Sequence, residues 1–321
     1  MTKEKKPRVL IAFGGNAIAI RGHEKVHQKE EFIVARKSME SVVDIFQKGY
    51  NKIVITHGNG PQVGRIFLQQ ELTKDEFPRQ VTLDVCVADS QGRIGYILQN
   101  VFDNICVERG IRKKTSTVIT QVVVDPNDSA FNNPTKPIGV FYTKEEAEKL
   151  IAERKWIMKE DAGRGWRRVV PSPKPIEIVE KSIFVELLDI DFTPIGVGGG
   201  GVPVTRKEDG ELRGVEAVID KDLSSALLAS VIGIDTFIIL TEVNHAYLDF
   251  KTSNQKPIFS ATVTEMEEFM KQGHFAEGSM RPKVQAATNF LKSGGSRAII
   301  ANLYELLPAL EGETGTQILP D

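Results

Sequence analysis

Gly196-Val197-Gly198-Gly199-Gly200-Gly201-Val202-Pro203 closes a short apolar run and is one of the two most informative segments of this chain. Consecutive glycines let backbone N–H groups approach a ligand without obstruction by side chains, the usual way in which a chain surrounds phosphate oxygens. Further along, Val218-Ile219-Asp220-Lys221-Asp222 places a lysine between two aspartates. Such a fixed ammonium group is suited to following negative charge as it moves between oxygens. The two motifs together indicate phosphoryl transfer.

Continuous apolar runs that end in turns recur along the chain and alternate with helical patterns. Strands that are apolar throughout are buried on both faces, as in a parallel sheet, and their alternation with helices predicts a doubly wound, three-layer α/β/α fold with a mainly parallel central sheet. The predicted strands are 9–13, 53–56, 117–124, 195–197, 237–240 and 298–300. The predicted helices are 31–48, 62–72, 94–105, 144–155, 221–230, 263–270 and 282–292.

Two further glycine turns, Gly14-Gly15-Asn16 and Gly58-Asn59-Gly60-Pro61, follow the first two predicted strands. In a doubly wound sheet, ligands bind at the carboxyl ends of the strands, so we expect these turns and the glycine quartet to form one anion pocket. Pro61 suits the first turn of the helix that follows, whose amino end would point at the pocket. His57, before the second turn, is interpreted as a structural residue.

Other phosphate-binding and catalytic motifs are excluded. Gly196-x-Gly198-x-x-Gly201 matches a dinucleotide fingerprint, but Val202-Pro203 continues extended where that fingerprint needs a helix. No Gly-Lys pair occurs, so there is no Walker A loop, and the protein-kinase signatures are absent. No serine–histidine or cysteine–histidine arrangement is persuasive. An acceptor that is already an anion needs no general base, and catalysis then reduces to alignment and charge neutralisation.

Composition places the chain among ordinary soluble proteins. The net charge of −2 predicts no binding to nucleic acid or to an anionic membrane, and no apolar run approaches the length of a membrane span. The first residues do not resemble a signal peptide. The two cysteines, Cys86 and Cys106, lie in one apolar-periodic stretch, which favours reduced thiols and a cytoplasmic location.

Three lysines have a context that sets them apart from ordinary exposed lysines. Lys221 stands between aspartates at a helix start, Lys136 lies between Pro134 and Pro137, and Lys283 begins another predicted helix. Lys136 belongs to a proline-rich segment, about residues 126–176, that breaks the strand–helix alternation and is interpreted as a protruding subdomain able to close over a site. The arginines of that segment, Arg164, Arg167 and Arg168, fit a solvated face or a set of salt bridges equally well.

Across nearly the whole chain, from about residue 9 to 316, these motifs resemble the carbamate kinases of the amino-acid kinase fold. The subdomain segments around Lys136 and 163–166 are the discriminating ones, because the glycine turns alone occur throughout the wider fold. The resemblance rests on the sequences at residues 12–17, 56–64, 90–92, 133–137, 159–167, 198–201, 218–222 and 273–283. It implies reversible phosphoryl transfer between ATP and carbamate, giving ADP and carbamoyl phosphate, a reaction used for ATP synthesis in arginine fermentation.

The resemblance also implies roles for particular residues. Lys221 would stabilise the transferring phosphoryl group, Asp222 would orient the lysines, Lys283 would hold the nucleotide phosphates and Lys136 would reach the substrate from the subdomain. The substrate would be surrounded by Gly14, Gly15, Asn16, Gly58, Asn59, Gly60, Gly199 and Gly200. The nucleotide would lie near Thr241, Val243, Asn244, Tyr247 and Lys283. No protein residue is expected to bind metal, because Mg²⁺ would be held mainly by the nucleotide phosphates.

The resemblance further implies a homodimer built around a shared central sheet and two lobes within one domain. Residues 1–195, including the subdomain, would form the carbamate side, and residues 196–321 the nucleotide side. Two alternatives stay open. One is a related kinase of the same fold that acts on another small carboxylate, and the other is a non-catalytic fold-mate that only binds nucleotide.

Overall fold

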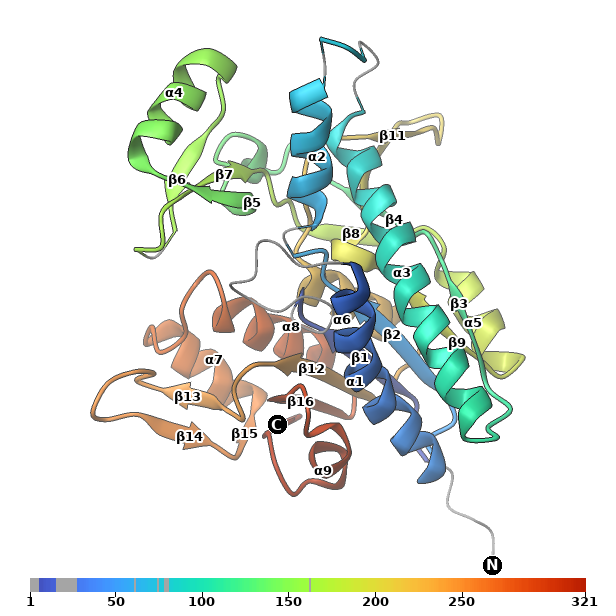
Figure 1. Ribbon diagram of the computed structural model, residues 1–321. Helices are drawn as coiled ribbons and strands as arrows, with labels where there is room; N and C mark the ends of the chain where they lie inside the picture. The colour runs from blue at the N-terminus through green and yellow to red at the C-terminus, as the bar shows by residue number, and fades with distance from the viewer. Residues whose placement is uncertain (1–5, 16–27, 61, 74, 78–80, 162) are drawn as a thin grey trace, which may run out of the picture.

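The computed structural model describes residues 6–15, 28–60, 62–73, 75–77, 81–161 and 163–321. Two residues of the sequence analysis, Asn16 and Pro61, lie outside the described residues. The described chain forms a three-layer α/β/α body with a small subdomain beside its upper end (Figure 1). The predicted fold class is confirmed.

An eight-stranded sheet forms the middle layer of the body. Its strand order is β15-β17-β16-β12-β1-β2-β9-β3, and every neighbouring pair is parallel except β16 and β17. In chain order these strands are β1 (Val9–Phe13), β2 (Ile53–His57), β3 (Lys114–Thr117), β9 (Phe192–Gly196), β12 (Thr236–Thr241), β15 (Ser260–Thr262), β16 (Arg297–Asn302) and β17 (Thr316–Leu319).

Both faces of this sheet are apolar and covered by helices, so its central strands are continuous apolar runs. In β1, Leu10 packs into the core on one face, and Ile11 packs into the core on the other. The first core includes residues of α5 (Lys181–Asp189), α6 (Lys221–Val231), α7 (Val263–Lys271) and α8 (Met280–Lys292). The second includes residues of α1 (Gln28–Gln47), α3 (Leu83–Glu108) and α9 (Leu306–Glu311).

The predicted strand 117–124 is wrong, because the chain forms two strands there in two different sheets. β3 ends at Thr117, and β4 (Gln121–Val124) belongs to a second sheet of order β11-β10-β4-β8. The break is held by Gln91 of α3, whose side-chain amide accepts from Thr120 N (2.8 Å) and donates to Thr120 O (3.1 Å). The Gln91 amide thus hydrogen-bonds both backbone groups of Thr120, and Thr120 O also accepts from Val202 N (2.8 Å) at the start of the second sheet. The other strands of this sheet are β8 (Pro175–Ile178), β10 (Val202–Arg206) and β11 (Leu212–Gly214).

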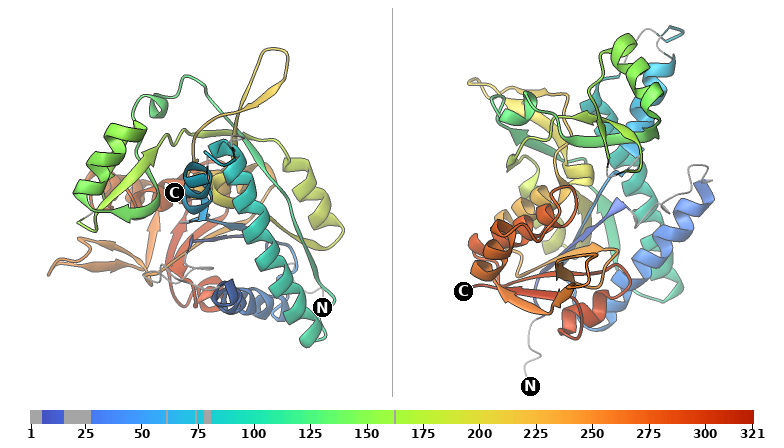
Figure 2. Two further views of the ribbon diagram at one scale, coloured as in Figure 1. Left: turned by 45° about the horizontal axis from the view of Figure 1, so that its top comes forward. Right: turned by 90° about the vertical axis from the view of Figure 1, so that its left-hand side faces the viewer.

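The segment around Lys136 forms a three-stranded antiparallel sheet covered by one helix, and we call it the lid. It contains β5 (Lys136–Tyr142), α4 (Lys144–Arg154), β6 (Met158–Glu160) and β7 (Trp166–Val170), with strand order β5-β7-β6. Its own core is small and consists of Ala147, Trp156 and Met158, with Leu68 of α2 packed against it. Figures 1 and 2 show that the lid lies beside α2 (Gln62–Thr73).

Most predicted elements occur in the structure with boundaries shifted by a few residues. The elements that were not predicted from the sequence are short: α5, α9, β15 and β17 of the central sheet, the small strands of the second sheet and the lid, and the hairpin of β13 (Ala246–Leu248) and β14 (Lys256–Ile258). The helix predicted from Ile94 begins earlier, at Leu83. In the described part of the chain, 3₁₀ turns also occur at Ser129–Phe131 and Gly198–Gly200.

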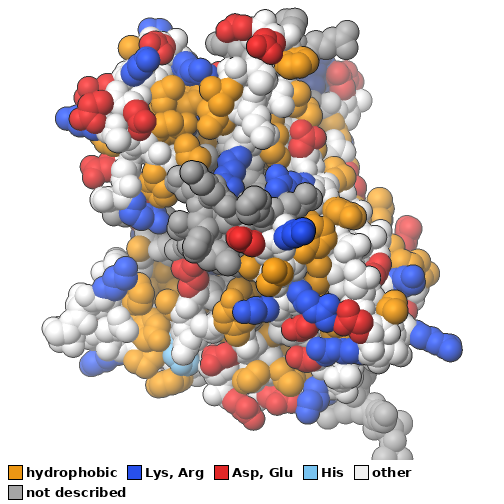
Figure 3. Space-filling model, viewed as in Figure 1, with side chains coloured by type: hydrophobic (Ala, Val, Ile, Leu, Met, Phe, Trp, Pro, Cys, Tyr) orange, Lys and Arg blue, Asp and Glu red, His pale blue; other side chains and the backbone are white. Residues whose placement is uncertain are grey.

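The division into lobes at residues 195 and 196 stays a prediction. The central sheet continues across it, and β10, which follows the division, pairs with β4 of the first lobe. Among the described residues, no helix has the length and apolarity that crossing a membrane requires. Acidic and basic side chains are interspersed over the face shown in Figure 3, in keeping with the small net charge.

Candidate functional site

The two N-terminal glycine turns lie directly against each other at the carboxyl ends of β1 and β2. Phe13 pairs with His57 in the parallel ladder, and Gly58 N donates to Phe13 O (3.0 Å). A Cβ added at Gly15 would lie 3.2 Å from Gly60 Cα, and one added at Gly58 would lie 3.3 Å from Gly15 N. Because the backbones approach this closely, a side chain at either position would separate the turns.

The glycine quartet packs onto the second of these turns. A Cβ at Gly198 would lie 2.5 Å from His57 Cε1, and one at Gly199 would lie 2.2 Å from Asn59 Nδ2. A Cβ at Gly200 would lie 2.4 Å from Ile219 O. Glycine is therefore required here by close approach to the protein itself. The quartet therefore lies between the β2 turn and the start of α6. Ser224 of α6 also contacts it, because Ser224 Oγ donates to Gly200 O (2.8 Å).

The amino end of α6 carries the motif Asp220-Lys221-Asp222. Asp220 is the N-cap, and its Oδ1 accepts from Asp222 N (2.9 Å) and Leu223 N (3.4 Å). The Lys221 side chain extends toward the β2 turn, since a Cβ at Gly58 would lie 3.6 Å from Lys221 Cδ. The first turn of α6 therefore presents its charged groups to the glycine turns.

Two further lysines from distant parts of the chain join this turn. Lys283 of α8 donates to Asp222 Oδ2 (2.8 Å), while Lys221 pairs with the other oxygen of the same carboxylate. Lys136, the first residue of β5 in the lid, donates to Asp220 Oδ2 (2.7 Å). The structure thus brings the three predicted lysines and Asp222 together, with Asp220 as an additional member. We call these five residues the lysine–aspartate cluster.

Burial and mutual attraction set the ionisation of the cluster. Burial opposes ionisation of Asp222, but the ammonium groups of Lys221 and Lys283 outweigh it and hold the pKa of this carboxyl well below its ordinary value. Burial likewise opposes ionisation of Asp220, and chiefly Lys136 shifts its pKa below the ordinary value. For Lys221, burial is the larger effect and lowers the pKa of the ammonium group, against the pull of Asp222. Both carboxylates are consequently charged at neutral pH.

His57 is a buried, neutral side chain close to Lys221. Burial, with a smaller contribution from the nearby Lys221 charge, lowers its pKa to about 4. Its Nδ1 lies 3.0 Å from Gly58 O, which can only accept, so the proton is on Nδ1. This agrees with the structural interpretation of His57.

Several polar residues to which the sequence assigned no role form hydrogen bonds with residues of the site. Thr56 Oγ1 lies 2.7 Å from Ser225 Oγ, which donates to Lys221 O (2.6 Å). Asn59 Nδ2 donates to Ser90 Oγ (3.3 Å). No local spacing relates Thr56 to Ser225 or Asn59 to Ser90, because each of these two pairs joins segments far apart in the chain.

The residues predicted to contact nucleotide lie at or after the carboxyl end of β12, on the same side of the sheet as the glycine turns. Thr241 ends β12, the neighbour of β1, and a Cβ at Gly14 would lie 3.6 Å from Leu240 O. Asn244 Oδ1 accepts from Asn302 Nδ2 (2.9 Å), so the end of β16 holds this loop. Val243 and Tyr247 lie in the same segment, with Tyr247 on β13. Asn302 was not predicted, although it too follows an apolar strand.

This arrangement can bind and neutralise a polyanion. It combines the glycine turns, the amino end of α6 and three ammonium groups near the carboxyl ends of the central strands. No cluster of three or more histidine, cysteine, aspartate or glutamate residues that could hold a metal ion occurs in the described part of the chain.

Comparisons with known proteins agree with this geometry. The model of the amino acid kinase family matches residues 7–302. Carbamate kinase of Pyrococcus furiosus is 49% identical over 315 residues, covering 98% of this chain and 99% of the relative. Carbamate kinase-like protein YqeA of Escherichia coli is 45% identical, covering 97% of this chain and 98% of the relative. The solved structure of carbamate kinase from Giardia lamblia bound to AMP-PNP has a TM-score of 0.89 and 41% identity, covering 98% of this chain and 99% of that one.

The shared carboxylate leads to a prediction about stability. Asp222→Asn should lower the free energy of unfolding at pH 7 by about 3 kcal/mol, because it leaves two partly buried ammonium groups without their counter-charge. The lowered pKa of Asp222 means that its contribution is present above the unfolded value, about 4, and is lost as pH falls below it. The difference between wild type and variant in urea unfolding should therefore shrink below pH 4. The matched control is Asp209→Asn in an exposed turn, and an Asp222→Asn protein as stable as that control would contradict the prediction.

Proposed function

The chain belongs to the amino acid kinase family and, within it, to the carbamate kinases, a class of phosphotransferases, and from that premise we propose that it catalyses reversible phosphoryl transfer between ATP and carbamate. The products are ADP and carbamoyl phosphate. The observation that carries the proposal is the convergence of Lys136, Lys221 and Lys283 on Asp220 and Asp222 beside the glycine turns. A protein that only bound nucleotide would gain nothing from a lysine delivered by a separate lid.

The chemistry of the acceptor fits a site without a general base. Carbamate is already an anion, so its oxygen attacks the γ-phosphoryl group without losing a proton. Among the described histidines, His57 is the one whose pKa Lys221 affects, and it is neutral with its Nδ1 proton donated to Gly58 O. We propose that Gly14, Gly15, Gly58, Gly60, Gly199 and Gly200 surround the carbamate and the transferring group with backbone, together with Asn16 and Asn59. Their part is alignment of the reacting oxygens.

The fixed charges supply the remaining stabilisation. Lys221 extends over the Gly58 turn, where the transferring phosphoryl group would lie, and neutralises the charge that spreads over its oxygens. Asp222 holds Lys221 and Lys283 on its two oxygens, so neither ammonium group must reorganise as the reaction proceeds. Lys283 holds the nucleotide phosphates, and Thr241, Val243, Asn244 and Tyr247 border the adenosine. Lys136 closes the site from the lid.

Magnesium enters this proposal as part of the nucleotide substrate. Asp220 and Asp222 are each paired with lysine, which leaves no open carboxylate set in the described cluster to hold a resident ion. Mg²⁺ bound to the nucleotide phosphates would neutralise part of their charge during transfer.

We further propose that the enzyme works in the direction of ATP synthesis in the cytoplasm, as in arginine fermentation. Carbamoyl phosphate is a mixed anhydride of a carboxylic and a phosphoric acid, a class of compound that readily phosphorylates ADP. The site itself serves both directions, since the same charges stabilise one transition state.

The edge of the central sheet supports a homodimer. β3 is the last strand of the sheet, and a groove between it and α3 is lined in part by Tyr96, Gln99, Asp103 and Ile119. Tyr96 and Ile119 are 57% and 45% exposed beside β3. The Thr115 and Thr117 N–H groups of this strand donate to side chains of α3, so a second copy would meet the groove through side chains. Packing of a second copy there would cover both apolar side chains.

In sedimentation velocity, the protein should therefore have twice the mass of the 35.6-kDa chain. Tyr96→Glu should shift it toward monomer, because a charge would be buried without a partner. Tyr304→Glu, at a large exposed residue in the turn that follows β16, is the matched control. A wild-type monomer at micromolar concentration would contradict the dimer.

The decisive test of function is ATP formation from carbamoyl phosphate and ADP. We expect rapid ATP formation with Mg²⁺, loss of it with EDTA, and little formation when acetyl phosphate is the donor. Equal rates with acetyl phosphate would instead favour a kinase for another small carboxylate. Nucleotide binding without any turnover would identify a non-catalytic relative.

Removing the central lysine should abolish most of the activity. Lys221→Ala should lower kcat by about two to three orders of magnitude, the scale for loss of one preorganised charge. The control is Lys271→Ala, whose side chain is 75% exposed at the end of α7. Steady-state kinetics of the two variants decide the point, and full activity in Lys221→Ala would remove this residue from the mechanism.

A further inference from the structure

The lid contacts the body through one face of α2. Gly64, Phe67 and Glu71 recur on this helix at spacings of three and four residues, so they lie on one face. A Cβ added at Gly64 would lie 2.0 Å from Gly139 N of the lid strand β5, which means that the two backbones touch. Glu71 Oε2 accepts from Arg154 Nη1 at the end of α4 (3.1 Å). We call this face of α2 the lid-contact face.

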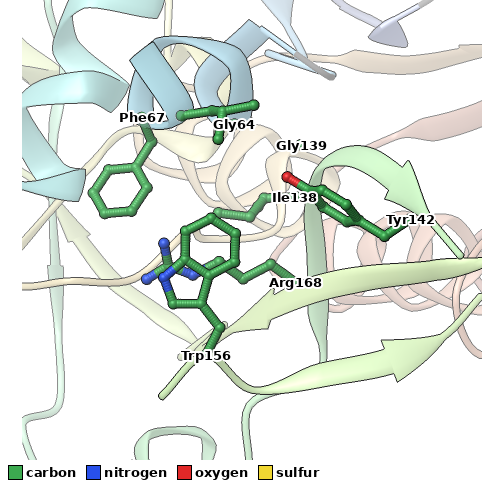
Figure 4. A pocket seen from close by; sticks show the side chains of 8 residues that line it. Gly64, Phe67, Ile138, Gly139, Tyr142, Trp156 and Arg168 are labelled. Carbon is green, nitrogen blue, oxygen red and sulfur yellow. The ribbon is translucent and has the colours of Figure 1, made fainter. Parts of the chain in front are cut away.

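Arg168 of β7 lies at the centre of this junction. Its guanidinium carbon is 4.5 Å from the ring centre of Phe67 on α2 and 4.5 Å from that of Trp156 in the lid core. Figure 4 shows Arg168 next to Trp156 and Phe67, at a small cavity that Gly64, Ile138, Gly139 and Tyr142 also line. The guanidinium therefore bridges an aromatic ring of the body and one of the lid.

This position is a costly one for a cation. Arg168 Nη1 is buried without a hydrogen-bond partner among the described residues, and burial lowers the pKa of the guanidinium. Attraction to two ring faces offsets part of the cost. An apolar side chain such as methionine would fill the same space more cheaply, since buried charges contribute little net stability. A planar group stacked on two rings, however, fixes the distance and orientation between them.

The strand register connects Arg168 to Lys136. Arg168 pairs with Ile138 and Val170 pairs with Lys136 across the antiparallel β5–β7 ladder, so these four side chains lie on one face of the lid sheet. Ile138 and Val170 are buried in the same cluster as Phe67 of α2. The position of the Lys136 ammonium group over Asp220 thus depends on how this face meets α2.

α2 is in turn tied to the catalytic turn. It begins at Gln62, whose N donates to Asn59 O (2.8 Å), immediately after the β2 glycine turn. One helix therefore carries the substrate turn at its amino end and the lid-contact face along its length. A lid fixed to this helix has a defined distance to the reacting group.

From this geometry we propose that Arg168 is a positioning residue for Lys136: its stacking between Phe67 and Trp156 sets the lid on α2 at the place where Lys136 reaches the substrate. The inference rests on the proposed function, since Lys136 is assigned there to the substrate side of the reaction. Nothing in it requires Arg168 to touch the substrate.

The test is a double-mutant cycle with Arg168→Met and Lys136→Ala. Arg168→Met keeps an apolar stem but loses the planar charge, and it should lower kcat/KM for carbamoyl phosphate by about 10- to 100-fold, the scale for a misplacement near 1 Å. The KM for ADP should stay unchanged. In the Lys136→Ala background, Arg168→Met should have no further effect, because the group it positions is gone. Fully additive effects, or an unchanged kcat/KM in the single variant, would overturn the proposal.

Arg164→Met is the matched control within the lid. Arg164 also lies over a ring, with its guanidinium carbon 5.2 Å from the centre of Phe141, but its side chain is 54% exposed and it has no contact with α2 among those described. Its kinetics should match wild type. If Arg168→Met does not fold, Phe67→Leu removes the other side of the stack and should give the same loss for carbamoyl phosphate alone.

A readout without turnover separates this inference from the proposed function. In hydrogen exchange of the ligand-free protein, Arg168→Met should accelerate exchange in residues 136–142 and leave α4 protected. A wild-type protein that does not use carbamoyl phosphate would refute the proposed function but leave this measurement intact. Unchanged exchange in residues 136–142 would refute the positioning role whatever the activity.

Discussion

The sharing of one buried carboxylate by two lysines is the interaction on which the rest of the site depends. Asp222 pairs with Lys221 of its own helix and with Lys283 of α8, and it stays ionised because both ammonium groups lie on it. Without that charge, two partly buried cations would repel each other at a distance where the low local dielectric strengthens repulsion. The amino end of α6 could not hold these two cations by itself, because its partial positive charge attracts anions and repels cations. Asp222 therefore makes a concentration of positive charge possible inside a folded protein.

Close approach to neighbouring protein atoms is the second constraint, and it explains the glycines better than ligand binding alone. A Cβ at Gly199 would meet the Asn59 side chain, and one at Gly200 would meet the Ile219 carbonyl group. These contacts bring the carboxyl ends of β2 and β9 to the amino end of α6. The candidate anion site is a consequence of that packing, because it gathers the glycine turns and the amino end of α6 at one place.

Sequence patterns predicted the central architecture because each central strand is apolar on both faces, a signal local to five or six residues. They failed between residues 117 and 124, where a β-branched run predicts one strand although Thr120 and Gln121 interrupt its apolar residues. Gln91, distant in sequence, holds the break between β3 and β4. The lysines were found because each has an unusual local neighbourhood. Thr56 and Ser225 were missed for the opposite reason: a buried hydrogen bond between separate segments leaves no local pattern. The lid strands are short and mixed in polarity, so periodicity does not define them either.

The lysines of the site come from two parts of the protein, the helices packed on the central sheet and the lid, and these parts are positioned in different ways. Lys221 and Lys283 lie on helices packed against the central sheet, and their positions follow from a large core. Lys136 lies on a lid whose own buried core is three side chains, too few to define an orientation relative to the body. Orientation must come from the interface with α2, where the backbones of Gly64 and Gly139 touch and the Arg168 guanidinium bridges two rings. A small lid can admit substrate and still return Lys136 to one place only if that interface is specific. A planar stacked cation provides that specificity, whereas an apolar contact of equal area allows sliding.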